Sequence, residues 1–175
     1  MFEVIAFTLI GLVGGILVYA ATRPDSFRIQ RSANIKAPPE RIFAILNDFQ
    51  QWAVWSPWEK KDPGMKRTFG STTVGTGATY AWEGNKDVGQ GSMAIVESSA
   101  PAKLAIRLDF IKPFEAHNIV EFTLEPIGDG TQVTWSMHGP SPYFSKLMSV
   151  FVSMDKMCGK DFEAGLASLK AVAEQ

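Results

Sequence analysis

Residues 37–58 read APPERIFAILNDFQQWAVWSPW, and this stretch sets the interpretation of the whole chain. Pro38 and Pro39 suit the start of a helix, because proline fixes φ and its missing N–H would have no partner there. Apolar side chains then recur at helical spacing: Ile42, Phe43, Ile45, Leu46 and Phe49. After Asn47-Asp48 loosens this helix, the spacing places three tryptophans at intervals of three residues: Trp52, Trp55 and Trp58. We expect this tryptophan cluster to be structural.

Strand patterns surround the stretch. Apolar and polar residues alternate over residues 27–35, which is typical of a strand with one buried face. A polar, solvated loop is expected at 59–64 and a short strand at 65–70. Further alternating runs predict strands at 78–83, 92–97, 104–110, 120–125 and 133–138, with a hairpin turn at 126–131.

A helical pattern then runs from residue 142 to the C-terminus. Ser141 is the expected N-cap, with Pro142 at the first helical position. Gly159 marks either a kink or a break between two helices. The apolar stripe consists of Phe144, Leu147, Met148, Phe151, Phe162, Leu166, Leu169 and Val172. Because the apolar face of the sheet must be covered, we expect this helix to lie on it, with residues 144–151 facing the strands.

This order of elements, with the motif at 37–58, resembles the START-like (SRPBCC) superfamily and, within it, the polyketide cyclase/dehydratase-like group. The resemblance covers about residues 26–174. It implies an α+β helix-grip fold, in which a curved antiparallel sheet packs on a long C-terminal helix and leaves a ligand pocket between them. The superfamily hosts binders, transporters and enzymes on one scaffold, so the resemblance specifies the fold more closely than the function.

The composition is that of a globular domain. Of 175 residues, 46% are hydrophobic and 20% charged, and the apolar leader leaves a length usual for one domain. A net charge of −1 gives no basic field, so nucleic acid is not an expected partner. The one cysteine, Cys158, cannot form an internal disulfide. Its apolar helical surroundings favour buried packing over a reactive thiol.

The leader is an uncharged run over residues 4–22. At about 1.5 Å per residue it spans roughly 28 Å, close to the thickness of a bilayer's hydrocarbon core. Arg23-Pro24 ends it, and Gly11 and Gly15 form a GxxxG pair, which is either a packing face or glycine scattered in a lipid span. We expect a single-pass membrane anchor over residues 1–25 and a START-like domain over 26–175.

Two alternatives to an anchor remain. A cleaved signal peptide is compatible with the cleavage site Val18-Tyr19-Ala20, although the only charge before the run is Glu3 rather than a basic residue. A buried soluble helix is the other alternative. Arg23, Arg28 and Arg31 follow the span and no Lys or Arg precedes it, so the positive-inside rule favours a cytoplasmic domain.

No catalytic constellation is visible in the sequence. It contains no GxSxG, P-loop, HExxH or CxxC motif, and no cluster with metal-ligand spacing. Neither a metal nor a cofactor is expected. His117 and His138 fall at a strand edge and on a polar strand face, where a solvated histidine is the expected state. Asp48, Tyr80 and His138 are the polar candidates for acid–base chemistry.

The unusual feature is the loading with aromatic residues and methionine. The candidates for lining an apolar pocket are Tyr80, Trp82, Phe110, Trp135, Met137, Phe151 and Met154. Those on strands lie on the apolar side of the alternation. Ordinary core packing is the alternative for each of them.

Three functions follow. The first is a membrane-anchored domain that binds a hydrophobic small molecule, such as a lipid, a quinone or a polyketide-like compound. The second is an enzyme of the cyclase/dehydratase kind, which needs an acid or base inside the pocket. The third is an interaction module that regulates a membrane partner. The oligomeric state is not determined by the sequence.

Overall fold

The computed structural model describes residues 2–175. Its strands form a seven-stranded antiparallel sheet in the order β1-β7-β6-β5-β4-β3-β2. The strands are β1 (Ser26–Ile35), β2 (Lys66–Phe69), β3 (Thr79–Glu83), β4 (Gln90–Ser99), β5 (Lys103–Lys112), β6 (Ala116–Ile127) and β7 (Gly130–Pro140). The helices are α1 (Phe2–Ala21), α2 (Pro39–Leu46), the 3-10 helix η1 (Phe49–Gln51), α3 (Trp52–Trp55), α4 (Pro57–Lys61), α5 (Tyr143–Phe151) and α6 (Met154–Ala173).

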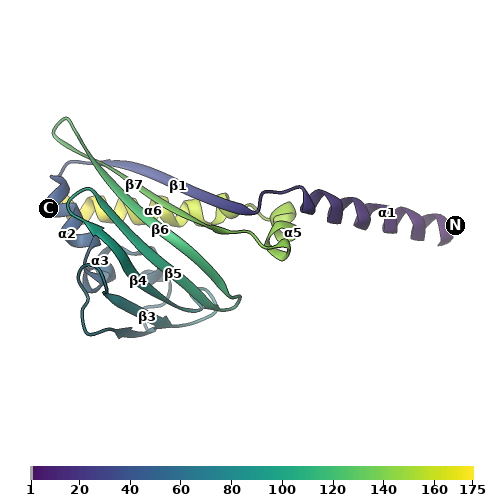
Figure 1. Cartoon of the computed structure of the whole chain (residues 1–175), viewed down its shortest axis with the longest axis horizontal. Coiled ribbons are helices and arrows are strands. Elements are labelled where there is room, and N and C mark those ends of the chain that lie inside the picture. The colour runs from purple at the N-terminus through teal and green to yellow at the C-terminus, as the bar shows by residue number, and fades with distance from the viewer. Residues whose placement is uncertain (1) are drawn as a thin grey trace.

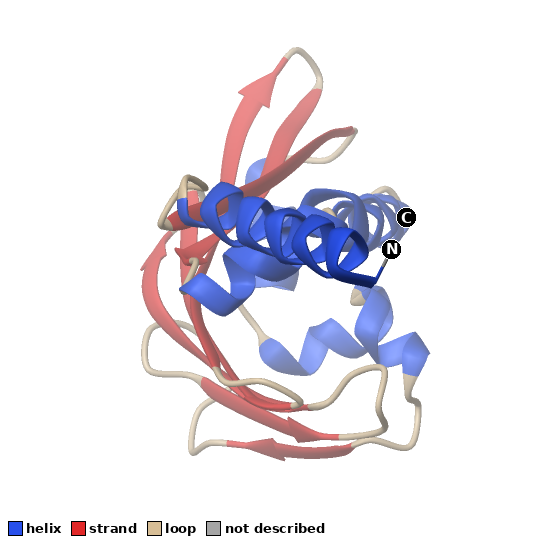
Figure 2. Cartoon of the chain, turned by 90° about the vertical axis from the view of Figure 1, so that its right-hand side faces the viewer, coloured by secondary structure: helices blue, strands red, loops and turns tan. Residues whose placement is uncertain are grey.

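The sheet is curved, and α6 lies across its concave face (Figures 1 and 2). Alternate residues of β7 are buried toward this helix, including Val133 and Trp135. From α6, Phe162 stacks on Trp135 with ring centroids 4.2 Å apart, and Leu166 and Leu169 are also buried. The predicted α+β helix-grip fold is therefore confirmed.

The stretch at 37–58 folds into short helices beneath the sheet. Pro38 is the N-cap of α2, as the proline pair predicts, and the buried face of this helix includes Ile42 and Leu46. Asp48 caps η1 by accepting a hydrogen bond from the backbone N–H of Gln50 at 2.9 Å. The indole of Trp52 donates to the carbonyl of Leu46 at 2.9 Å, which ties the tryptophan cluster back to α2.

The three tryptophans of the cluster differ in how deeply they are buried. Trp52 and Trp55 are buried, and Trp58 is half-buried. Trp55 and Trp58 both pack edge-on against Trp135 of β7. The cluster therefore connects the short helices to the sheet.

The C-terminal helical region differs from the expectation at both its start and its break. Ser141 is not the N-cap, because the helix begins one residue later than predicted, with Pro142 as its N-cap. The break lies at Val152 and Ser153, where the backbone is extended, and Gly159 lies inside α6. The Ser153 hydroxyl accepts from the backbone N–H of Lys156 and so caps α6.

Helix α5 does not cover the sheet, contrary to the expectation for residues 144–151. Its apolar stripe is exposed, with Phe144 at 56% and Phe151 at 67%. The opposite side carries Lys146, which is buried and forms an ion pair with Asp25. With Lys146 on the inner side of α5, the apolar stripe faces outward.

The sequence predicts a solvated loop at residues 59–64, and this prediction is wrong for residues 59–61. Residues 57–61 form α4, with Pro57 at its first position, as proline favours. Glu59 is 8% exposed and faces the interior. Lys61, the last residue of α4, forms an ion pair with Asp161 of α6 at 2.7 Å.

Helix α1 projects away from the domain as an isolated rod (Figure 1). Among the described residues it is the one helix long and apolar enough to cross a membrane, and almost all of it is exposed. Its last turns lie beside α5, where the hydroxyl of Tyr143 donates to the carbonyl of Leu17 at 3.0 Å. Arg23, just after α1, donates to the hydroxyl and carbonyl of Ser149 at 3.4 Å.

Candidate functional site

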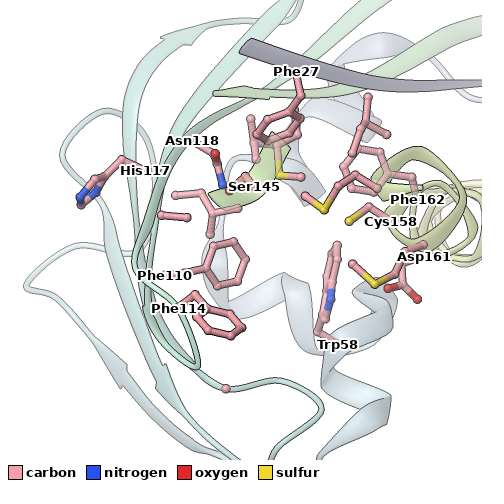
Figure 3. A pocket seen from close by; sticks show the side chains of 18 of the residues that line it. Phe27, Trp58, Phe110, Phe114, His117, Asn118, Ser145, Cys158, Asp161 and Phe162 are labelled. Atoms are coloured by element: carbon pink, nitrogen blue, oxygen red, sulfur yellow. The ribbon is translucent and has the colours of Figure 1, made fainter. Parts of the chain in front are cut away.

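A cavity of about 920 Å³ lies between the concave face of the sheet and the helices (Figure 3). Its volume is within the range of roughly 300–1,000 Å³ that small-molecule pockets occupy. Strands β1 and β3 to β7 contribute to one wall, and Trp58, Cys158 and Phe162 form the opposite wall. Because most of these side chains are apolar, the cavity suits an apolar ligand.

The cavity has its mouth at the end of the domain where α1 joins. We define the mouth by five of the exposed lining residues at this end: Pro24, Phe114, Ser145, Val152 and Met157. Exposed charged residues, among them Lys112 and Glu115, flank Phe114. The five mouth residues come from the segment after α1, the β5–β6 turn, α5, the connection between α5 and α6, and the first turn of α6. The mouth is therefore built from segments that are far apart in the sequence.

The structure brings six of the seven sequence-predicted lining residues together. Those that line the cavity are Tyr80, Trp82, Phe110, Trp135, Met137 and Met154. The strand residues among them project from the concave face, as alternation predicts. Trp82 packs edge-on against Phe110, and its indole N–H donates to the carbonyl of Val88 at 3.0 Å.

Phe151 is the exception. It is 67% exposed and lies outside the lining of the cavity. The reason is the orientation of α5, whose inner side presents Ser145 and Ser149 to the cavity instead. The position predicted for Phe151 is therefore wrong, because its helical stripe faces outward.

Charged residues also line the cavity, and one of them, Glu59, is buried. Glu59 of α4 accepts a hydrogen bond from the hydroxyl of Tyr80 at 2.8 Å, and Arg67 of β2 donates to its other oxygen at 2.7 Å. Burial, reinforced by donation to Glu59, raises the pKa of Tyr80 far above its ordinary value. The hydrogen bond to Glu59 also raises the pKa of Arg67. The phenol therefore stays protonated and the guanidinium stays charged at neutral pH.

Sequence reasoning missed Glu59 and Arg67, which we call, with Tyr80, the polar triad. One local signal was available: Ser56-Pro57 is a helix-start pattern, which argues against a loop at residue 59. The pairing itself has no local signal, because Glu59, Arg67 and Tyr80 come from three different elements. Only the packing of α4 against β2 and β3 brings them together.

The other polar candidates lie outside the cavity. Asp48 caps η1 and does not line the cavity. His138 lies on the convex side of β7, with Nδ1 3.8 Å from a carboxylate oxygen of Glu121. His117 is among the lining residues, but its ring points away from the cavity (Figure 3), and its hydrogen bond to Asp109 raises its pKa.

Cys158 lines the cavity and is half-buried. Burial is the main cause that raises the pKa of its thiol, so the thiol is protonated at neutral pH. Within residues 2–175 no group of three or more histidine, cysteine or carboxylate side chains is placed to hold a metal ion.

The comparisons with known proteins agree with this architecture. Residues 26–174 match the model of the family described as polyketide cyclase / dehydrase and lipid transport. No curated protein sequence matches the chain.

Solved structures of low identity share the fold. Protein CV1439 from Chromobacterium violaceum superposes with a TM-score of 0.60 at 17% identity, covering 87% of this chain and 99% of that chain. The Aha1 dimer from Colwellia psychrerythraea gives 0.60 at 17% identity, with 85% and 96% covered. A protein from Arthrobacter aurescens gives 0.57 at 22% identity, with 84% and 87% covered. Since the family model spans nearly all of the chain after α1, this chain belongs to the polyketide cyclase/dehydrase and lipid transport family.

Proposed function

We propose that this chain is a membrane-anchored domain that binds an apolar small molecule, such as a lipid, a quinone or a polyketide-like compound. The observation that carries the proposal is the cavity of about 920 Å³ between the sheet and α6. Enclosing an apolar molecule there removes its surface from water, which is favourable by about 25 cal/mol per Å².

The polar triad narrows the class of ligand. Tyr80 and Glu59 both line the cavity, so a ligand can reach the phenol oxygen and the carboxylate. The Tyr80 hydroxyl donates its proton to Glu59, and its oxygen keeps the capacity to accept a hydrogen bond. We therefore infer a mostly apolar ligand that carries a hydroxyl group at one end, which can donate to this oxygen.

The same contact supports a second candidate, an enzyme of the cyclase/dehydratase kind. Such an enzyme needs an acid or base inside the pocket, and the Tyr80 hydroxyl lies 2.8 Å from the Glu59 carboxylate there. The family description names both activities, cyclisation or dehydration and lipid transport. An interaction module without a ligand is the least supported function, because such a module needs no cavity of this size.

The anchor is part of the proposal. Helix α1 exposes a continuous apolar surface that water does not favour, and its length matches a bilayer core. We assign residues 1–25 to the anchor and 26–175 to the binding domain, with the domain on the cytoplasmic side because Arg23, Arg28 and Arg31 follow the span.

The test is native mass spectrometry of the full chain purified from its own membranes. We expect a co-purified apolar molecule on the wild-type chain and on Gln132→Trp. Met137→Trp, which adds the same ring inside the cavity, should lose it at an unchanged melting temperature. Gln132 is the matched control because it lies on the same strand and does not line the cavity.

Two outcomes would contradict the binding function. One is a wild-type chain that carries no small molecule. The other is a loss of roughly 1–3 kcal/mol in the unfolding free energy of Met137→Trp, which is typical of overpacking a full core. Turnover of the recovered molecule by the wild-type chain, abolished in Glu59→Gln, would favour the enzyme instead.

A further inference from the structure

Helix α5 turns its apolar side outward and its polar side toward the domain, which is the reverse of a helix that packs on a soluble domain. Phe144, Met148 and Phe151 share one side at spacings of four and three residues, and they are 56%, 46% and 67% exposed. The inner side carries Lys146, which is paired with Asp25, and Ser149, which contacts Arg23. The outer face of α5, defined by these three apolar residues, is therefore an apolar strip without cover in the described chain.

A second element extends this strip across the mouth of the cavity. Phe114, in the β5–β6 turn, is 68% exposed and lies with its ring centroid 5.9 Å from that of Phe144. Phe114 also lines the cavity, where Figure 3 shows it next to Phe110. Phe114 therefore belongs both to the apolar strip and to the mouth of the cavity, so the two are adjacent.

The strip is continuous with the apolar surface of α1. The Tyr143 hydroxyl, at the start of α5, donates to the carbonyl of Leu17 in the penultimate turn of α1. Leu17 precedes the end of α1 by four residues, or about 6 Å along the helix. If α1 spans the bilayer and its end marks the surface of the hydrocarbon core, the contact with Leu17 places the start of α5 about 6 Å below that surface. Interfacial helices are immersed to roughly 5–10 Å, so this depth is typical of them.

We propose that the outer face of α5, together with Phe114, is immersed in the surface of the bilayer. This immersion places the mouth of the cavity directly against the bilayer surface. The ligand then enters directly from the lipid phase and does not cross water. This inference rests on the proposed anchor and adds the source of the ligand. The bilayer is the occupant because α1 already requires one, and the strip begins beside α1 and carries no charge.

The test uses the full chain in phosphatidylcholine vesicles, with Cys158→Ser as the background so that one introduced cysteine can carry an environment-sensitive dye. The dye is placed in turn at Phe144→Cys, Phe151→Cys and Phe114→Cys. Leu12→Cys, in the middle of α1, reports on the anchor. Ile127→Cys is the matched control: it is an exposed apolar residue at the β6–β7 turn, at the opposite end of the domain from α1 (Figure 1).

Quenching by lipids with a nitroxide near the headgroup end of the acyl chain is compared with quenching by aqueous iodide. We expect the dyes at 144, 151 and 114 to be quenched by the lipid nitroxide and protected from iodide, and the dye at 127 to show the reverse. Circular dichroism confirms that each labelled chain is folded.

The outcomes separate this inference from the anchor. If position 12 is quenched by a nitroxide at the bilayer centre and positions 144, 151 and 114 behave like 127, the inference is wrong and the anchor stands. Protection of 144 and 151 from both quenchers means that a second protein chain covers the strip, which also overturns it. If position 12 is not quenched, the anchor fails and the inference falls with it.

Discussion

Tyr80 and Glu59 show how much depends on one hydrogen bond in this protein. Glu59 is 8% exposed, and its two oxygens are held by Tyr80 and Arg67. We predict that Tyr80→Phe lowers the unfolding free energy by about 1–3 kcal/mol, because Glu59 stays buried and loses a donor. Urea unfolding in detergent measures this. Tyr19→Phe removes the same hydroxyl from an exposed phenol and should change little; equal losses in both variants would contradict the prediction.

The same residue predicts a dependence on alkaline pH. Burial and the hydrogen bond to Glu59 raise the pKa of folded Tyr80, whereas an unfolded tyrosine titrates near about 10. The folded state therefore holds its proton after the unfolded state has released it, so this contribution is present below pH ~10 and is lost above it. We expect the unfolding free energy of the wild type to fall more steeply above that pH than that of Tyr80→Phe. Parallel pH profiles would count against the buried phenol.

Two tryptophans of the cluster have different roles: Trp55 packs in the core, and Trp58 lines the cavity. Trp55 is fully buried, whereas Trp58 is half-buried and has one side on the cavity. We predict that Trp55→Ala costs about 3–5 kcal/mol of unfolding free energy. Trp58→Ala should cost less, because its removal enlarges an existing space. Thermal and urea unfolding of both variants test this, and an unchanged midpoint for Trp55→Ala would show that the cluster is exposed.

At the scale of elements, α6 approaches the sheet closely because it carries glycine on its inner face. A Cβ at Gly165 would lie 2.6 Å from the ring of Trp135 and 3.1 Å from Pro57. We predict that Gly165→Ala lowers the unfolding free energy by about 1–3 kcal/mol, since overpacking outweighs the gain in helix propensity. Gly159→Ala is the control, because its Cβ would displace only the guanidinium of Arg31, whose ion pairs with Asp155 and Glu163 lie at the surface. A stabilised Gly165→Ala would mean that the helix is free to move away.

At the scale of the whole molecule, the contacts of residues 23–25 decide where the domain can be cut. Asp25 pairs with Lys146, and Arg23 contacts Ser149. We predict that a chain of residues 23–175 is soluble and melts cooperatively. A chain of 26–175 should melt at a lower temperature, because Lys146 loses its partner Asp25 and the backbone N–H of Ser141 loses the carbonyl of Asp25. Equal melting temperatures would show that these two contacts add nothing.

The full chain should behave differently from both truncated chains during fractionation. Because α1 exposes a continuous apolar surface, we expect the full chain to remain in the membrane pellet after a carbonate wash. Soluble protein of a mature length that starts near Ala21 would identify α1 as a cleaved signal peptide instead.

The sequence by itself determined the element types and the inner face of the sheet. Strict alternation puts Tyr80, Phe110, Trp135 and Met137 on one side of their strands whatever the neighbours are, because the side-chain period of a strand is two. The stretch at 37–58 determined α2 in the same way, through local proline and apolar spacing. These are properties of the local chain, so they could be predicted without the tertiary structure.

Only the tertiary structure decided what each helical face meets. A helical stripe states that one side is apolar, but it does not state what that side meets, so the expectation that Phe144 and Phe151 face the strands is wrong. The burial of Glu59 could not be predicted either, because Tyr80 and Arg67 reach it from β3 and β2. A charged side chain is buried only where distant elements supply its partners, and that pairing exists only once the chain has folded.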